Sequence, residues 1–107
     1  MAETKVLRIE EKRLDFSAAP DFQERLLDAV DEGGGNLILD FGNVEYIASV
    51  GLRALILASK KSKTLGGSLV VAGLQPLVRE IFEISRFDQL LTITGSVADA
   101  VAASRPA

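Results

Sequence analysis

Residues 37–56 read LILDFGNVEYIASVGLRALI, and this stretch decides the fold. With Asn36, its first part (NLILDF, 36–41) is a short, continuous apolar run, which is typical of a strand covered on both faces. Its last part opens a helix that continues beyond it, with one face formed by Leu52, Leu55, Ile56 and Ser59. The seven residues GNVEYIA link the two elements. A buried strand that leads into a helix in this way indicates an α/β sheet.

The sequence on both sides continues the alternation of strands and helices. We expect the other strands at residues 5–11 (KVLRIEE), 13–16 (RLDF), 68–73 (SLVVAG) and 89–93 (QLLTI). No internal repeat or linker interrupts the order, so the chain of 107 residues is expected to form one domain. The predicted class is α/β with helical crossovers.

The remaining helices have recognisable starts and stops. The first begins at Ser17 or Ala19 and ends at the glycines 33–35, and Gly66 with Gly67 stops the next. Pro76 opens a third helix, whose inward residues are predicted to be Leu77, Val78, Ile81 and Phe82. Ser96 and Asp99 are spaced as a capping box for a last helix over SVADAVAAS (96–104). The final RPA is expected to be loose.

Composition restricts the chemistry. The chain contains no histidine and no cysteine, so the usual general base, the commonest metal ligand and any disulfide are missing, and we expect neither metal nor cofactor. A net charge of −3 argues against a general nucleic-acid binder. No apolar run is long enough for a signal core or a membrane span, which indicates a cytoplasmic protein without membrane insertion.

Acidic residues give only a weak enzymatic hypothesis. Asp15, Asp40 and Glu45 are a candidate carboxylate cluster at one edge of the sheet, but acids at strand ends are usually solvated. Asp40-Phe41-Gly42 matches the metal-binding triplet of protein kinases, yet the other kinase motifs are missing. The sequence therefore predicts no catalytic residue.

Ser49 is the residue with two competing interpretations. At a helix start it is a good N-cap, which requires no further function. Gly51, however, weakens the first turn and suits a position where something approaches the backbone closely. A phosphate on Ser49 would be tolerated at the positive end of the helix dipole and would change the surface charge. The position is thus a cap, a phosphorylation site, or both.

The same helix carries a basic outward face. Arg53, Lys60 and Lys61 are expected to share this face, and Leu57 lies among them. One interpretation is a solvated face with a stray leucine, which is normal. The other is a partner-binding surface with Leu57 as its apolar contact. The residues alone leave both interpretations open.

Several blocks together resemble a known family. LILDFGNVEYIASVGLRALI is similar to the central block of STAS domains of the anti-sigma factor antagonist family. RLDFSAAPDFQERL resembles the Leu-Asp block and first helix of that family, and GGSLVVAGLQPLVREIFEISRFDQLLTI resembles its third helix with the flanking strands. The resemblance covers nearly the whole chain, and it implies a single STAS domain over residues 1–107, ordered over about 4–103. It also implies a mixed sheet with helices packed mainly on one side.

The resemblance also implies a function. In the bacterial antagonists, the serine matching Ser49 is phosphorylated by a partner that is both anti-sigma factor and serine kinase. Unphosphorylated antagonist binds that partner and releases the sigma factor, and a serine phosphatase restores it. By this resemblance Asp15 lies near the phosphorylation site, whose surroundings are Ala48, Val50, Gly51 and Leu52. The chain would then be a substrate and a binding module rather than an enzyme.

The sequence departs from the family at four positions. Ala48 stands where many antagonists have Asp, Val50 where many have Ser or Thr, Lys12 where a glycine is common, and Arg86 where a glycine often ends the third helix. Loss of the acid at position 48 changes the charge beside Ser49. An alternative function is suggested by this departure: a constitutive scaffold, or an accessory subunit of a signalling complex or of a lipid-transport ABC system, in which Ser49 is only a cap.

Overall fold

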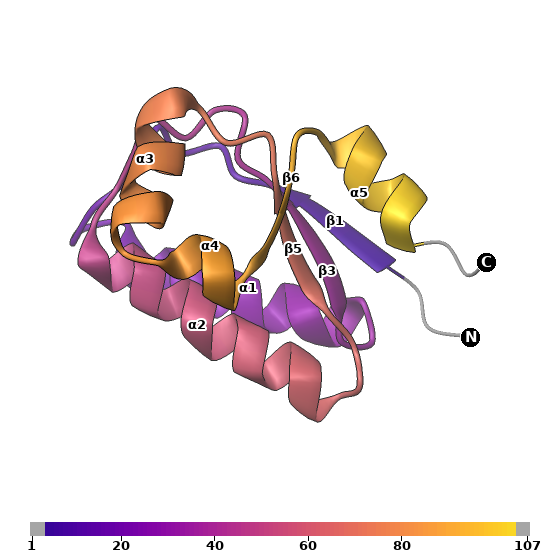
Figure 1. The fold of residues 1–107 in the computed structure, drawn as a ribbon. Helices are drawn as coiled ribbons and strands as arrows, with labels where there is room; N and C mark the ends of the chain where they lie inside the picture. Colours follow the sequence, from indigo (N-terminus) through magenta and orange to yellow (C-terminus); the bar gives the residue numbers. More distant parts are fainter. Residues whose placement is uncertain (1–3, 105–107) are drawn as a thin grey trace.

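The computed structural model describes residues 4–104, and the side chains of residues 4–102. Strands and helices alternate over this range (Figure 1). The strands are β1 (Thr4–Arg8), β2 (Arg13–Leu14), β3 (Asn36–Asp40), β4 (Tyr46–Ile47), β5 (Leu69–Ala72) and β6 (Thr92–Thr94). The helices are α1 (Ala19–Glu32), α2 (Ser49–Thr64), α3 (Pro76–Ile84), α4 (Phe87–Leu90) and α5 (Val97–Ser104). The predicted α/β class is confirmed.

The main sheet has four strands in the order β1-β3-β5-β6. All of its pairings are parallel, with Val6 opposite Ile38 and Leu39 opposite Val71. The prediction of a mixed sheet is therefore wrong, because the strands of the main sheet are all parallel. The reason is that the chain crosses over between every two neighbouring strands, by way of α1, α2 or α3 with α4, and each crossover returns the next strand in the same direction.

Two helices cover one face of this sheet and one covers the other. α1 and α2 lie side by side below the sheet in Figure 1, and α5 lies on the opposite side. The larger core lies between the sheet and α1, α2 and α3. Its phenylalanines Phe22, Phe41 and Phe82 are fully buried and pack edge to face, with neighbouring ring centroids 6.4 Å apart. Helices thus pack mainly on one side, as expected.

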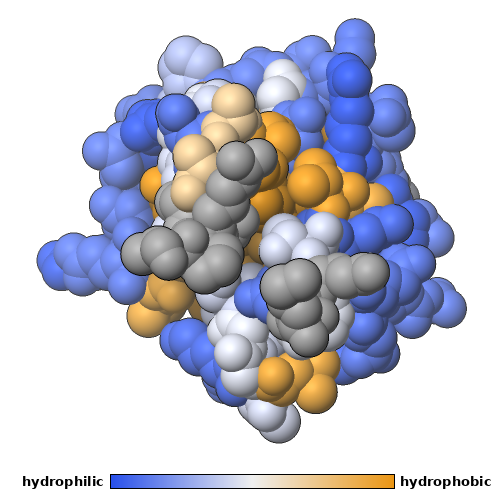
Figure 2. Space-filling model, turned by 90° about the vertical axis from the view of Figure 1, so that its right-hand side faces the viewer, coloured by the Kyte–Doolittle hydropathy of each residue, from blue (hydrophilic) through white to orange (hydrophobic). Residues whose placement is uncertain are grey.

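The second face of the sheet has a smaller core. Ala100 of α5 is buried against Ile38 and Ala72 of the central strands. Figure 2 shows the right-hand side of Figure 1, where α5 lies, with apolar residues near the centre and mostly polar ones toward the edge. The cap predicted for α5 is confirmed, because the Ser96 hydroxyl accepts a 3.1 Å hydrogen bond from the Asp99 N–H.

Three local predictions are wrong. Leu77 is 51% exposed rather than inward, since α3 turns Val78 and Phe82 toward the core and Leu77 lies about 100° around the helix from Val78. The strand expected at 89–93 begins at Thr92, because Phe87–Leu90 forms the single helical turn α4. The first strand ends at Arg8, before Glu10 and Glu11. The tail RPA lies outside the described residues.

A short second pair of strands completes the fold. β2 and β4 are parallel, with Arg13 opposite Tyr46 and Leu14 opposite Ile47. β4 lies inside the segment that the sequence indicated only as a link. Because β4 leads directly into α2, this pairing holds the end of β2 next to the start of that helix.

Candidate functional site

The β2–β4 pair places two segments, distant in sequence, beside each other. The Ala48 N–H donates a 2.9 Å hydrogen bond to the Leu14 carbonyl, which continues the ladder by one step. Asp15 and Phe16 follow β2, and Ala48 and Ser49 follow β4. The structure therefore brings Asp15 to the end of the molecule where α2 begins.

Ser49 is not the cap of α2. The N-cap is Ala48, with φ −87° and ψ 170°, and its carbonyl accepts the Leu52 N–H at 3.1 Å. Ser49 is the first helical residue, and its exposed side chain forms no hydrogen bond with the described part of the chain. The first N–H groups of a helix lack acceptors within it, and alanine supplies no side-chain oxygen for them. The hydroxyl is free, and the capping interpretation is wrong.

Gly51 has a structural reason. The residue is buried, and a Cβ atom built on it would lie 2.7 Å from Ile47 Cγ1 and 3.3 Å from the Leu14 carbonyl oxygen. The backbone of α2 therefore approaches the β2–β4 pair too closely for any side chain. The sequence indicated a close approach to this glycine, and the group that approaches it is the β2–β4 pair of the protein itself. Gly51 accordingly gives no separate support for a phosphate.

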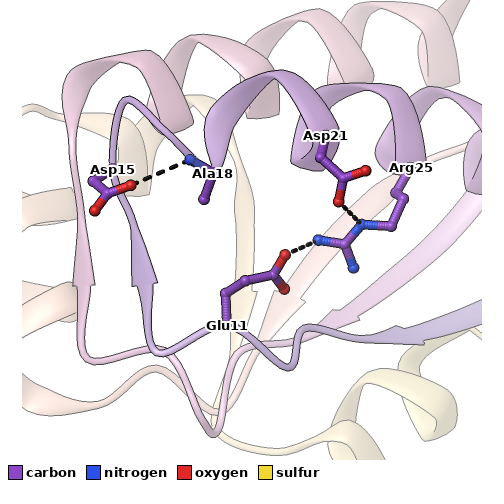
Figure 3. A network of polar contacts seen from close by, with 5 residues as sticks. All are labelled: Glu11, Asp15, Ala18, Asp21 and Arg25. Carbon is purple, nitrogen blue, oxygen red and sulfur yellow. Dashed lines mark hydrogen bonds and ion pairs between the residues drawn. The ribbon is translucent and has the colours of Figure 1, made fainter.

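Asp15 holds the start of α1. Its Oδ1 accepts hydrogen bonds from the Ser17 N–H (3.1 Å), the Ser17 hydroxyl (2.8 Å) and the Ala18 N–H (3.2 Å), and Figure 3 shows the last of these. These bonds, first that from the Ser17 hydroxyl, lower the pKa of Asp15 below its ordinary value of 3.8. The carboxylate fixes the turn that carries Phe16.

Glu11, Arg25 and Asp21 form a second polar contact on α1. Figure 3 shows the Arg25 guanidinium between the two acids, paired with Glu11 and 3.0 Å from Asp21 Oδ2 through its Nε. Glu11 precedes β2, so the arginine ties that connection to α1. The second oxygen of Glu11, Oε1, is buried without a hydrogen-bond partner in the described structure. These contacts fix the position of α1. Because Arg25 is already paired with two acids, it is not free to bind a further anion near Ser49.

The basic face of α2 has three of its four predicted members. Arg53 and Lys60 are exposed, Leu57 is 40% exposed, and neither cation has an ion pair among the described residues. Lys61 does not belong to it. Its Nζ lies 2.7 Å from Asp31 Oδ2 and donates a 3.1 Å hydrogen bond to the Leu27 carbonyl, both on α1. The long side chain bends back to α1 and joins the two helices.

An open hollow lies against the first turns of α1 and α2, and sequence reasoning missed it. Its lining residues come from the β2–α1 turn, α1 and the start of α2: Phe16, Ala19, Pro20, Gln23, Val50 and Arg53. Phe16 is 73% exposed, which is unusual for so large an apolar side chain. The sequence placed Phe16 at the end of the strand expected at residues 13–16, but that strand ends at Leu14. Leu52, in contrast, is buried and contributes to the core.

The three acids of the candidate carboxylate cluster serve separate roles. Asp40 Oδ1 accepts the Gly42 N–H at 2.9 Å, a Glu45 oxygen lies 4.0 Å from Lys12 Nζ, and Asp15 Oδ1 accepts the Ala18 N–H just before α1. Residues 4–102 contain no group of three acids placed to hold a metal ion. None of the helices in the described range is long and apolar enough to cross a membrane.

The fold and this site together define a small α/β domain with an exposed serine at the start of its second helix. Residues 2–100 match the model of the STAS domain family, so the chain belongs to that family. The chain is 38% identical over 89 residues to BtrV of Bordetella bronchiseptica, named as a candidate anti-sigma factor antagonist, and this alignment covers 83% of the chain and 77% of BtrV.

Solved structures have the same fold. A candidate anti-sigma factor antagonist from Thermotoga maritima has a TM-score of 0.83 at 19% identity, covering 94% of this chain and 88% of that one. The Bacillus cell-fate determinant SpoIIAA in its phosphorylated form has a TM-score of 0.67 at 17% identity, covering 98% of this chain and 96% of that one. At these identities the likeness concerns the fold.

Proposed function

We propose that this protein is an anti-sigma factor antagonist that acts by partner switching, with Ser49 as its phosphorylation site. The observation that carries the proposal is the free, exposed hydroxyl of Ser49 at the start of α2. The relationship to BtrV supports it. In this proposal the chain is a cytoplasmic binding module and a kinase substrate, with no catalysis of its own.

The unphosphorylated protein binds an anti-sigma factor that has serine kinase activity. The binding surface surrounds Ser49 and consists of Phe16 in the β2–α1 turn and Arg53, Leu57 and Lys60 on α2. Aromatic and arginine side chains are the residue types that most often dominate binding energy. Because Asp15 fixes the turn, little conformational freedom of the Phe16 backbone is lost on binding.

Phosphorylation ends this interaction. It adds about 1.5 to 2 negative charges beside the basic face, and it leaves the domain intact because a helix N-terminus favours an anion. The N-cap residue Ala48 has no carboxylate that would repel the phosphate. A serine phosphatase removes the group and restores binding.

The proposal is tested by incubating the protein with its cognate anti-sigma kinase and ATP, then locating the phosphate by peptide mass spectrometry. We expect one phosphate on Ser49, none in Ser49→Ala, and normal phosphorylation in the control Ser85→Ala, which changes an exposed serine at the end of α3. Ser49→Asp is expected to lose binding, and Ser49→Ala to keep it. Phosphate on another residue would reject the proposal.

A constitutive scaffold is the second candidate, and Ala48 in place of an acid is the observation that favours it. In that case Ser49→Asp and Ser49→Ala would bind the partner equally well. The stability of Ser49→Ala does not separate the two functions, because Ser49 does not cap α2, and we expect the free energy of unfolding to change by less than about 0.5 kcal/mol in either case.

A further inference from the structure

Arg53 lies one helical turn beyond Ser49 on the same exposed face of α2. Residues four apart on a helix are surface neighbours, and long side chains in helices lean toward the N-terminus. Arg53 lines the hollow together with Val50 of the same helix and Phe16 of the β2–α1 turn. The spacing therefore brings the Arg53 side chain within reach of the first turn of α2, which carries Ser49.

The Arg53 guanidinium is available for a new anionic partner. It forms no ion pair within the described residues, although acids lie at this end of the molecule. Asp21 is bound by Arg25, and Oδ1 of Asp15 is taken up by Ser17 and Ala18. Lys60, the other exposed cation of the face, lies almost two turns farther along α2 and serves as a natural comparison.

We propose that the phosphate on Ser49 binds the guanidinium of Arg53, which withdraws this cation from the partner surface. The inference rests on the proposed function for its biological meaning. Guanidinium groups form paired, charge-assisted hydrogen bonds with phosphate, which lysine does not reproduce. Phosphorylation thus acts twice, because it adds negative charge and also removes the positive charge that an acidic partner surface would contact.

The test needs no kinase. Phosphoserine is installed at position 49 during translation, in the otherwise unchanged chain and in Arg53→Gln and Lys60→Gln. The second pKa of the phosphate, about 6 for a free phosphoserine, is then measured by phosphorus NMR at low salt. We expect it to be higher in Arg53→Gln than in the unchanged chain by at least about 0.3 unit, and nearly unchanged in Lys60→Gln.

A second readout reports on the arginine directly. The side-chain Nε–H signal of Arg53 should shift when Ser49 carries phosphate, and it should not shift in Ser49→Asp to the same extent. Equal phosphate pKa values in the unchanged chain and in Arg53→Gln would overturn the inference, and so would equal effects of Arg53→Gln and Lys60→Gln. Failure of the kinase to modify Ser49 would reject the proposed function instead, and it would not affect this measurement.

Discussion

Replacing Gly51 by alanine tests how α2 is seated on the β2–β4 pair. In an isolated helix this change is favourable, by about 0.5 to 1 kcal/mol, because alanine loses less backbone freedom on folding. Here the added Cβ would lie 2.7 Å from Ile47 Cγ1. Ile47 is only 2% exposed, so its side chain has no open space into which to turn.

The magnitude is set by these two opposing effects. Forcing an extra methyl group into a packed core costs about 1 to 3 kcal/mol. After subtraction of the helix gain, we expect Gly51→Ala to lower the free energy of unfolding by about 1 kcal/mol. For a domain of this size that corresponds to a decrease in Tm of roughly 4 °C.

A double-mutant cycle with Ile47→Ala, measured by urea unfolding, separates the two effects. Ile47→Ala removes the clashing atoms, so Gly51→Ala in that background should be neutral or stabilising. The expected coupling between the two positions is at least about 1 kcal/mol. If Gly51→Ala stabilises the protein equally in both backgrounds, the close approach of α2 to the strand pair is refuted.

Three further predictions concern residues around the site and the fold. Lys61→Met should lower the free energy of unfolding, measured in urea, by about 1 kcal/mol, because the contacts of Lys61 Nζ with Leu27 and Asp31 are lost. In the exposed control Lys60→Met, the free energy of unfolding should change by less than about 0.5 kcal/mol. The pKa of Asp15 is lowered in the folded state, so its stabilising effect is fully present above its ordinary value of 3.8 and is lost as the pH falls through the lower folded pKa. The stability difference between the unchanged chain and Asp15→Asn should therefore be constant at neutral pH and shrink below 3.8 in acid titrations, and a difference that grows there would contradict the assignment. Arg86 has φ 61°, a left-handed conformation that costs a non-glycine residue about 1 kcal/mol, so Arg86→Gly should raise Tm in a thermal unfolding experiment.

The order of strands and helices was predictable from the sequence because each element has its own periodicity. Leu37, Ile38 and Leu39 belong to a short apolar run that is typical of a buried strand, and the glycines after α1 and α2 mark the ends of these helices. β4 was not predicted, because its two residues lie inside a segment that the sequence indicated only as a link between a strand and a helix. The pairing of β4 with β2 depends on the tertiary structure, and it determines where the whole site lies.

The site was predictable as a location but not in its contacts. A cap depends on the ψ angle of one residue, so the sequence suggested Ser49 where the structure has Ala48. The sequence does not distinguish Lys61 from Lys60. Only Lys61 bonds to α1, which the tertiary structure places within reach of its side chain. Phe16 lies in an irregular turn, where no pattern distinguishes an aromatic residue that is exposed from one that is buried.

Mapping the phosphate on the protein purified from its native cells tests the central claim most directly. Peptide mass spectrometry should find a fraction of the molecules phosphorylated on Ser49, and only the unphosphorylated fraction should be isolated in complex with an anti-sigma factor. If phosphate is found on a different residue, or if the phosphorylated and unphosphorylated forms are bound equally, the switch at Ser49 is contradicted.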